Sequence, residues 1–257
     1  MSRYNHALRN LIPLRNEKVD KENMPADSAG LFSYIFFSWM TPYIWKAYKK
    51  GITIMDTPRI SPYESCKYNA HRLEVLWQEE LSKYGPNLAS FPMVAWRFVR
   101  TRICAAWLLL SCTTICGFIS PMILMRKILE HIQSPEENIW DGIKWALLLI
   151  LCDTFRMIFF TWTWNTNIRT ALRLKSACTT LLYKKIIRLN SLGSKSSGEL
   201  TNLFSNDSQR LFDVIIYGPM IISGPIVVTC GIIYILWIFS PLALLGTFAF
   251  LAFYPCQ

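Results

Sequence analysis

The 257-residue sequence has long stretches that lack any charged side chain. Residues 214–257, the last 44, contain no Asp, Glu, Lys or Arg, and residues 103–125 form a second uncharged run. Soluble surfaces are rarely built from such stretches, whereas a helix needs about 20 apolar residues to cross the hydrocarbon core of a bilayer. With 52% hydrophobic residues, the composition also excludes a disordered chain. These absences predict an all-α, polytopic membrane protein.

Sequence motifs for nucleotide, metal and nucleophilic chemistry are missing as well. The sequence contains no GxxxxGK[ST] loop, no GxGxxG, no HExxH and no GxSxG. The eight cysteines form no CxxC pair and lie mostly in apolar runs, so neither a zinc site nor a disulfide framework is predicted. The three histidines fall on three separate segments. We therefore expect no catalytic, cofactor or metal site in this chain, and no enzymatic activity of its own.

The net charge of +10 is distributed unevenly. Residues 1–102 carry 15 basic and 9 acidic side chains, residues 103–165 carry 4 and 5, and residues 166–257 carry 8 and 3. Basic residues accumulate on the cytoplasmic side of membrane proteins. We therefore expect the N-terminus and residues 166–213 in the cytoplasm, and residues 126–144 outside. Because the basic residues flank apolar spans and do not form one folded face, no nucleic-acid binding is expected.

The apolar runs predict about four membrane spans, which cover residues 103–125, 143–164, 214–239 and 242–257. The fourth run has only 16 residues, fewer than a span needs, so we expect an incomplete helix. The helical pattern of the second span continues to residue 190. At about 1.5 Å per residue, that helix is roughly 70 Å long and must project far into the cytoplasm. Pro121, Pro219 and Pro225 are expected to bend the spans that contain them.

Two further segments precede the first span. Residues 31–45 are uncharged and aromatic but too short to cross a bilayer, and three lysines follow within five positions. Such a segment is typical of a helix that lies in the headgroup layer. Residues 71–85 place Leu73, Leu76 and Trp77 on one helical face, which predicts a cytosolic connector helix.

Asp153 and Arg156 are the one pair of opposite charges inside an apolar run. Ionisable residues at this depth are costly and normally face a partner or a cavity. One interpretation is a structural pair that fixes helix packing. The other is that Arg156 faces a translocation cavity and attracts an anionic solute. Trp162 and Trp164 are expected in the aromatic belt at the cytoplasmic interface.

The segment that follows residue 197 resembles a known family. The run GELTNLFSNDSQRL (198–211), with LYKKIIRLN upstream, is similar to the first intracellular loop of subfamily C of the ATP-binding cassette (ABC) transporters, the multidrug-resistance-associated proteins. The matching positions are Gly198-Glu199, Asn202-Leu203, Ser205, Asp207 and Gln209-Arg210. Residues 29–42 resemble the family's interfacial elbow helix, residues 71–81 its connector, and residues 4–13 the N-terminal lasso of the short branch that contains members five, eleven and twelve.

This resemblance implies part of the first transmembrane domain of a type-I ABC exporter. It implies a lasso-like cytosolic segment in residues 1–30, an elbow helix and connector in residues 31–102, and a partial transmembrane domain in residues 103–257, with the first intracellular loop at 166–213. The break near residue 195 would form a coupling helix that docks on a nucleotide-binding domain through Ser194, Ser197, Gly198 and Glu199. An ordinary helix-to-helix loop is the alternative. ATP and magnesium would be cofactors of the intact family, with none in this chain.

Two functions follow as hypotheses. In the first, the chain is part of an ATP-driven exporter of organic anions or amphipathic solutes, inactive alone because it lacks nucleotide-binding domains. Its partners would be the lipid bilayer, a nucleotide-binding domain and further transmembrane domains, in the plasma membrane. Anion exporters of the family place basic residues within the first span, however, and residues 108–118 contain none. In the second, the chain is a self-standing membrane adaptor or regulatory protein that binds a partner through its basic cytosolic regions.

Overall fold

The computed structural model describes residues 24–133, 138–188, 196–238 and 246, and within these ranges every regular element is helical. Residues 1–23 of the lasso-like segment, Ser194, and all of the fourth predicted span except Gly246 lie outside the described residues. The long helices are α6 (Phe91–Ile119), α8 (Ile139–Arg188) and α10 (Ser208–Ile238), and α7 (Met125–Gln133) extends the line of α6. The other α-helices are α2 (Pro25–Ser28), α3 (Leu31–Ile35), α4 (Thr41–Lys50), α5 (Cys66–Tyr84) and α9 (Ser197–Asn202).

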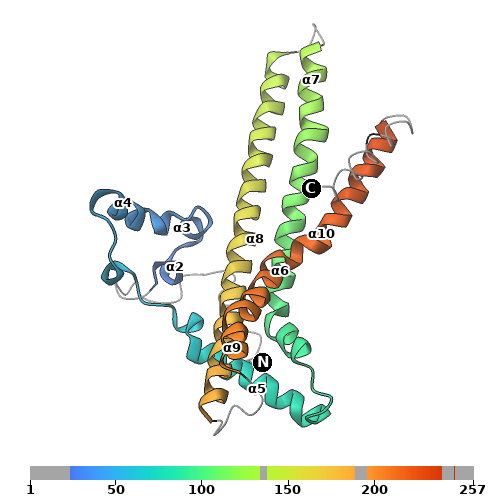
Figure 1. Ribbon diagram of the computed structural model, residues 1–257. Coiled ribbons are helices and arrows are strands. Elements are labelled where there is room, and N and C mark those ends of the chain that lie inside the picture. Colours follow the sequence, from blue (N-terminus) through green and yellow to red (C-terminus); the bar gives the residue numbers. More distant parts are fainter. Residues whose placement is uncertain (1–23, 134–137, 189–195, 239–245, 247–257) are drawn as a thin grey trace.

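Two antiparallel columns form the centre of the molecule (Figure 1). One consists of α6 and α7, joined by the π-helical turn η4 (Ser120–Leu124), and the other is α8. Pro121, where a bend was predicted, lies inside η4, where a π-bulge interrupts the regular hydrogen bonding. The bend itself stays a prediction. The second predicted span begins a single helix of 50 residues. At 1.5 Å per residue this helix is about 75 Å long, as the sequence predicted.

Helix α10 leans away from the two columns (Figure 1). It is joined to α9 by a second π-helical turn, η5 (Leu203–Asp207), and contains Pro219 and Pro225. Asn167 Nδ2 of α8 donates to the carbonyl oxygen of Ile216 at 3.2 Å, near the start of the predicted third span. None of the α10 residues after Pro219 is buried. Farther along α10, the Tyr234 hydroxyl donates to the carbonyl oxygen of Met122 in η4 at 3.2 Å. The helix is therefore packed into the core at one end and joined to η4 by a hydrogen bond near the other.

The predicted interfacial segment consists of three short pieces beside the columns (Figure 1). They are α3, the 3₁₀ turn η1 (Ser38–Met40) and α4, and together we call them the elbow segment. Phe37 has a left-handed conformation with φ 55°, which separates α3 from η1. Pro42 stands in the first turn of α4, where its missing N–H costs no helical hydrogen bond. The segment is thus broken before Pro42 and helical after it.

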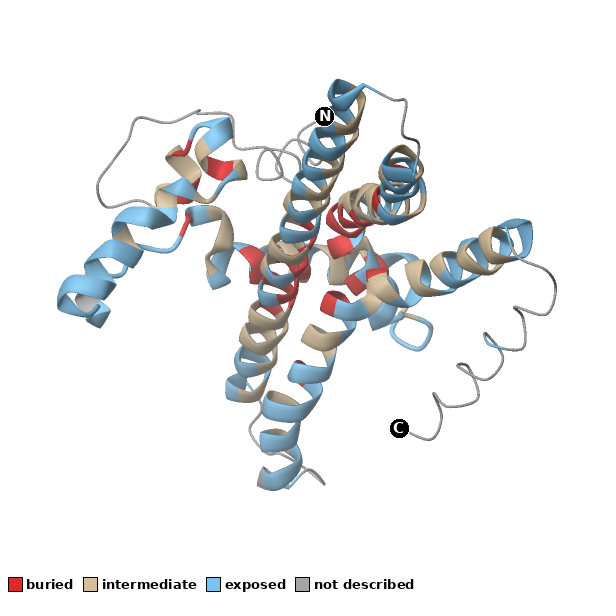
Figure 2. Ribbon diagram, turned by 90° about the horizontal axis from the view of Figure 1, so that it is seen from above, coloured by how far each residue is buried: buried red, intermediate tan, exposed pale blue. Residues whose placement is uncertain are grey.

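The main core lies where α5, α6, α8 and α10 meet. Leu73, Val94 and Leu174 are almost completely buried there, and Figure 2 shows the buried residues gathered around the centre of the view. The apolar face predicted for α5 is confirmed, since Leu76 and Trp77 pack against this core. By contrast, α8 has no buried residue before Thr163.

Two helical segments in the described part of the chain are long and apolar enough to cross a membrane: Phe91–Gln133 and Gly198–Ile238. They contain the first and third predicted spans. The second predicted span lies in α8, whose apolar run is interrupted by Asp153 and Arg156, and it is not one of these two segments. It nevertheless lies along α6 and α7 in the same pair of columns (Figure 1).

Candidate functional site

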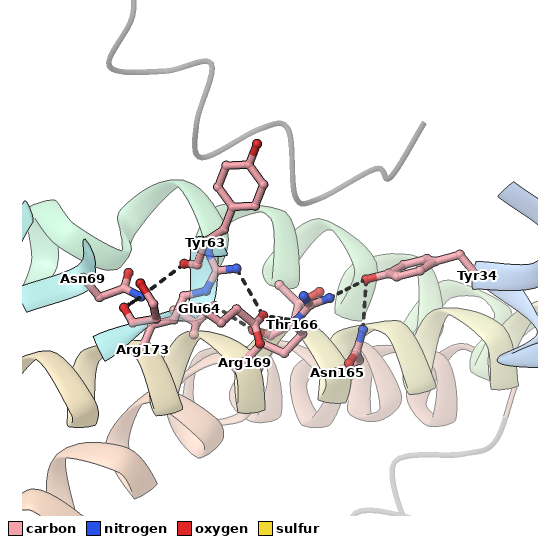
Figure 3. Close-up of polar contacts among 10 residues, drawn as sticks. Tyr34, Tyr63, Glu64, Asn69, Asn165, Thr166, Arg169 and Arg173 are labelled. Carbon is pink, nitrogen blue, oxygen red and sulfur yellow. Dashed lines mark hydrogen bonds and ion pairs between the residues drawn. The ribbon is translucent and has the colours of Figure 1, made fainter. Parts of the chain in front are cut away.

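A polar cluster joins three parts of the chain beside the core. Glu64 ends the 3₁₀ turn η3 (Pro62–Glu64), which directly precedes α5, and its Oε1 accepts hydrogen bonds from two arginines of α8. Arg169 donates through Nε, and Arg173 through Nη2 at 3.1 Å. Arg169 also donates through Nη1 to the Tyr34 hydroxyl at 3.1 Å. Figure 3 shows these side chains in one row along α8. We call Tyr34, Glu64, Arg102, Arg169 and Arg173 the Glu64 cluster.

Local structure positions the side chains of this cluster on α8 and at the start of α5. Arg169 and Arg173 are four residues apart in a helix, so both project from one face of α8. Asn165, one turn earlier, donates to the Tyr34 hydroxyl at 3.2 Å and holds the elbow segment against α8. Asn69 fixes the start of α5 by donating to the carbonyl oxygens of Tyr63 and Ser65 at 3.1 and 3.0 Å.

The electrostatics favour an ionised Glu64. Burial alone raises the pKa of its carboxyl group, but the guanidinium groups of Arg169 and Arg173 outweigh burial and hold the pKa below its usual range. The pKa of Arg169 is raised by Glu64 in spite of burial, whereas the pKa of Arg173 is lowered because burial and its basic neighbours prevail. Glu64 is therefore negatively charged at neutral pH, and it links α8 to the start of α5, the predicted connector helix.

Arg102 of α6 completes the cluster from a third side. It is 6% exposed and interacts electrostatically with Arg173, Arg169, Glu64 and Tyr34. Its Nη2 atom is buried and has no hydrogen-bond partner among the described residues, and the same holds for Nε of Arg173. Sequence reasoning missed this cluster, although the spacing of Arg169 and Arg173 on one helical face was a signal that could have been noticed.

The predicted pair of Asp153 and Arg156 is formed. Arg156 Nε lies 3.1 Å from Asp153 Oδ1, and both side chains are 39% exposed. A Cβ added to Gly117 would lie 3.5 Å from Arg156 Cδ, an ordinary van der Waals contact, so the arginine side chain lies against α6 at this glycine. Asp153 lines a shallow groove of about 530 Å³ between α8 and the end of α3, with Phe36 and Phe37 on its other side. The role of the pair in a translocation path stays a prediction.

The predicted coupling residues lie at the start of α9. Glu199 and Gly198 are exposed there, Ser197 is the first helical residue, and Ser194 is outside the described part of the chain. The hydroxyl of Ser196, which the sequence reading did not single out, accepts a hydrogen bond from the Glu199 backbone N–H at 3.1 Å and caps the helix. Docking on a nucleotide-binding domain stays a prediction.

The two tryptophans predicted for the aromatic belt are both packed against other elements. Trp162 meets the Tyr34 ring edge-on at 5.9 Å between centroids, and Trp164 meets Tyr217 of α10 at 6.2 Å. No group of three or more metal-ligating side chains occurs within the described ranges. The two tryptophans therefore form structural joints between helices.

Comparison with known proteins gives consistent matches. The chain is 27% identical to "ATP-binding cassette sub-family C member 3" of Mus musculus over 257 residues, which cover 90% of this chain and 17% of that protein. It is 26% identical to "ABC transporter C family member 8" of Dictyostelium discoideum over 215 residues, 83% of this chain and 13% of that protein. It is 27% identical to "Metal resistance protein YCF1" of Saccharomyces cerevisiae over 225 residues, which cover 78% of this chain and 14% of that protein.

The chain spans less than a fifth of the length of these relatives. The family model described as "ABC transporter transmembrane region" matches residues 106–257, more than half of the chain. The resemblance to subfamily C is thereby confirmed, while assignment to its short branch stays a prediction. The chain therefore belongs to the ABC transporter transmembrane family, and the mouse and Dictyostelium relatives support its resemblance to subfamily C.

Proposed function

We propose that this chain forms part of the membrane pathway of an ATP-driven exporter of organic anions or amphipathic solutes. Nucleotide-binding domains elsewhere in the assembly would bind ATP and magnesium, and the chain would be inactive without them. The N-terminus and the loop at residues 166–213 would face the cytoplasm, and the assembly would reside in the plasma membrane. Family membership favours this function over that of a self-standing adaptor.

The continuity of α8 is the observation that supports this proposal. One helix, Ile139–Arg188, passes from the predicted outer loop through the apolar region to the main core, on the side predicted to be cytoplasmic. Because the helix is unbroken, a displacement at its cytoplasmic end is passed to Asp153 and Arg156 without an intervening hinge. The Glu64 cluster would make the connector and the elbow segment follow the same displacement.

The coupling surface would be the exposed start of α9. Glu199 stands in the first turn of this helix, where Ser196 fixes the backbone. A nucleotide-binding domain that contacts this turn would move α9 and, through α10, the third predicted span. Sequence and structure agree that this turn is accessible, since Gly198 and Glu199 are exposed.

The experiment measures ATP-dependent uptake of a fluorescent organic anion into inside-out vesicles, together with vanadate-sensitive ATPase activity. The chain alone should show neither activity, and an assembled transporter that contains residues 1–257 should show both. In that assembly, Glu199→Ala should reduce transport per ATP hydrolysed several-fold. Asp141→Ala, at the opposite end of α8, is the matched control and should leave this ratio unchanged. ATPase activity in the chain alone, or equal ratios for both variants, would contradict the proposal.

A further inference from the structure

Positive charge outweighs negative charge in the buried Glu64 cluster. Three guanidinium groups, those of Arg102, Arg169 and Arg173, interact electrostatically with one another around the carboxylate of Glu64. Arg72 acts on Arg173 from α5, and Asp27 acts on Arg169 from α2. The described residues thus bring four arginines and two carboxylates to this junction. Buried charges normally occur in balanced, hydrogen-bonded sets, so the excess calls for an anion.

Unused hydrogen-bond donors point in the same direction. Nη2 of Arg102 and Nε of Arg173 are buried and have no acceptor in the described part of the chain. Both side chains are more than nine-tenths buried, with 6% of each residue exposed. Glu64 does not satisfy these donors, since its Oε1 atom accepts from other nitrogens, namely Arg169 Nε and Arg173 Nη2. Arg72, by comparison, donates to the Phe98 carbonyl oxygen at 3.1 Å and stacks on the Phe98 ring.

We propose that the Glu64 cluster binds a phosphate group through Arg102 and Arg173. Phosphate offers several oxygen acceptors in a compact space, and the planar guanidinium fork matches pairs of them. The cluster reaches water at Glu64 and Arg169, whose side chains are 19% and 14% exposed. At this junction four arginines face two carboxylates, so a bound anion improves the balance of charge. This inference is independent of whether the chain takes part in export.

The position of the cluster along α8 allows two sources of phosphate. Trp162 packs against the elbow segment at the predicted membrane interface, and Arg169 follows seven residues later. At 1.5 Å per residue, the cluster lies about 10 Å beyond that interface along the helix. A phosphorylated lipid headgroup of the cytoplasmic leaflet can reach this depth, and so can a soluble phosphate compound.

The test measures the melting temperature of the full chain in nanodiscs with two probes. One probe is inorganic pyrophosphate added to phosphatidylcholine nanodiscs, and the other is phosphatidylinositol 4-phosphate incorporated into them. A ligand that binds the folded state raises the melting temperature with concentration. A rise with pyrophosphate assigns a soluble source, and a rise with the lipid alone assigns the headgroup. No rise with either probe overturns the proposal.

Variants separate binding from general electrostatics. Arg102→Met should weaken the apparent affinity about tenfold, and Arg102→Lys should retain part of it. Arg126→Met is the matched control, since this arginine pairs with Glu130 near the opposite end of the columns. Glu64→Gln removes the competing carboxylate and should tighten binding, a gain that a merely destabilised protein does not show. Equal affinities for Arg102→Met and Arg126→Met, or weaker binding by Glu64→Gln, would overturn the proposal.

Discussion

The two ends of the long helices are built differently. At the end predicted to lie in the cytoplasm, which we call the cytoplasmic end, α5, α6, α8 and α10 enclose one apolar core, and the Glu64 cluster ties them to the elbow segment. Toward the other end, Leu108, Leu147 and Ile221 are 62–71% exposed. The cytoplasmic end therefore supplies its own packing partners, whereas the apolar end needs lipid or further helices to cover it. This difference suits a membrane domain whose helices separate and close while their bases stay together.

The largest expected effect comes from removing the central carboxylate. Glu64→Ala leaves Arg169 and Arg173 buried without their shared acceptor, and removal of one member of a buried ion pair costs about 3–5 kcal/mol. Chemical denaturation of the chain in detergent micelles measures this loss of unfolding free energy. Asp141→Ala, which removes an exposed pairing partner of Lys144, should cost far less. Comparable losses for the two variants would show that the Glu64 cluster does not hold the cytoplasmic end together.

A core truncation tests the packing itself. Leu174 is completely buried in α8, so Leu174→Ala should lower the unfolding free energy by about 2–4 kcal/mol. Leu172, two residues earlier, is 53% exposed and offers a matched control. Leu172→Ala removes the same atoms from an exposed position and should cost under about 0.5 kcal/mol in the same denaturation experiment. A cost for Leu172→Ala as large as that for Leu174→Ala would contradict the placement of the core.

Acid should loosen the cytoplasmic end by a smaller amount. Because the pKa of Glu64 is lower in the folded than in the unfolded chain, its contribution is complete above the unfolded value of about 4.3. The contribution is lost as the pH falls through the lower, folded pKa. Melting temperatures recorded between pH 6 and pH 3 should therefore fall more steeply for the wild type than for Glu64→Gln. Parallel curves would mean that Glu64 does not titrate as the structure indicates.

The smallest effect on stability is expected at the apolar end. Arg156→Ala breaks a half-exposed pair within one helix, so the unfolding free energy should change by less than about 1 kcal/mol. In an assembled transporter, the same variant should reduce uptake of an organic anion more than uptake of a neutral amphipathic solute. Equal loss of both, together with poor expression, would instead favour the structural interpretation of the pair.

Sequence patterns predicted the elements better than their contacts. Apolar runs and the 3.6-residue period predicted the long helix of α8 and the buried face of α5, because these properties depend on neighbouring residues. The Glu64 cluster depends on residues up to 135 positions apart, such as Tyr34 and Arg169, and no local pattern specifies that they meet. Asp153 and Arg156 were found because their three-residue spacing places them on one helical face.

The distinction between the two ends can be measured directly by electron–electron double resonance on the chain in lipid nanodiscs. Spin labels on unnatural amino acids would replace exposed residues: Val75 and Leu172 at the cytoplasmic end, and Leu147 and Ile221 at the apolar end. We predict a narrow distance distribution for the Val75–Leu172 pair, which reports on α5 and α8. We predict a broad distribution for the Leu147–Ile221 pair, which reports on α8 and α10. Equally broad distributions for both pairs would contradict the claim that the cytoplasmic end is a rigid base.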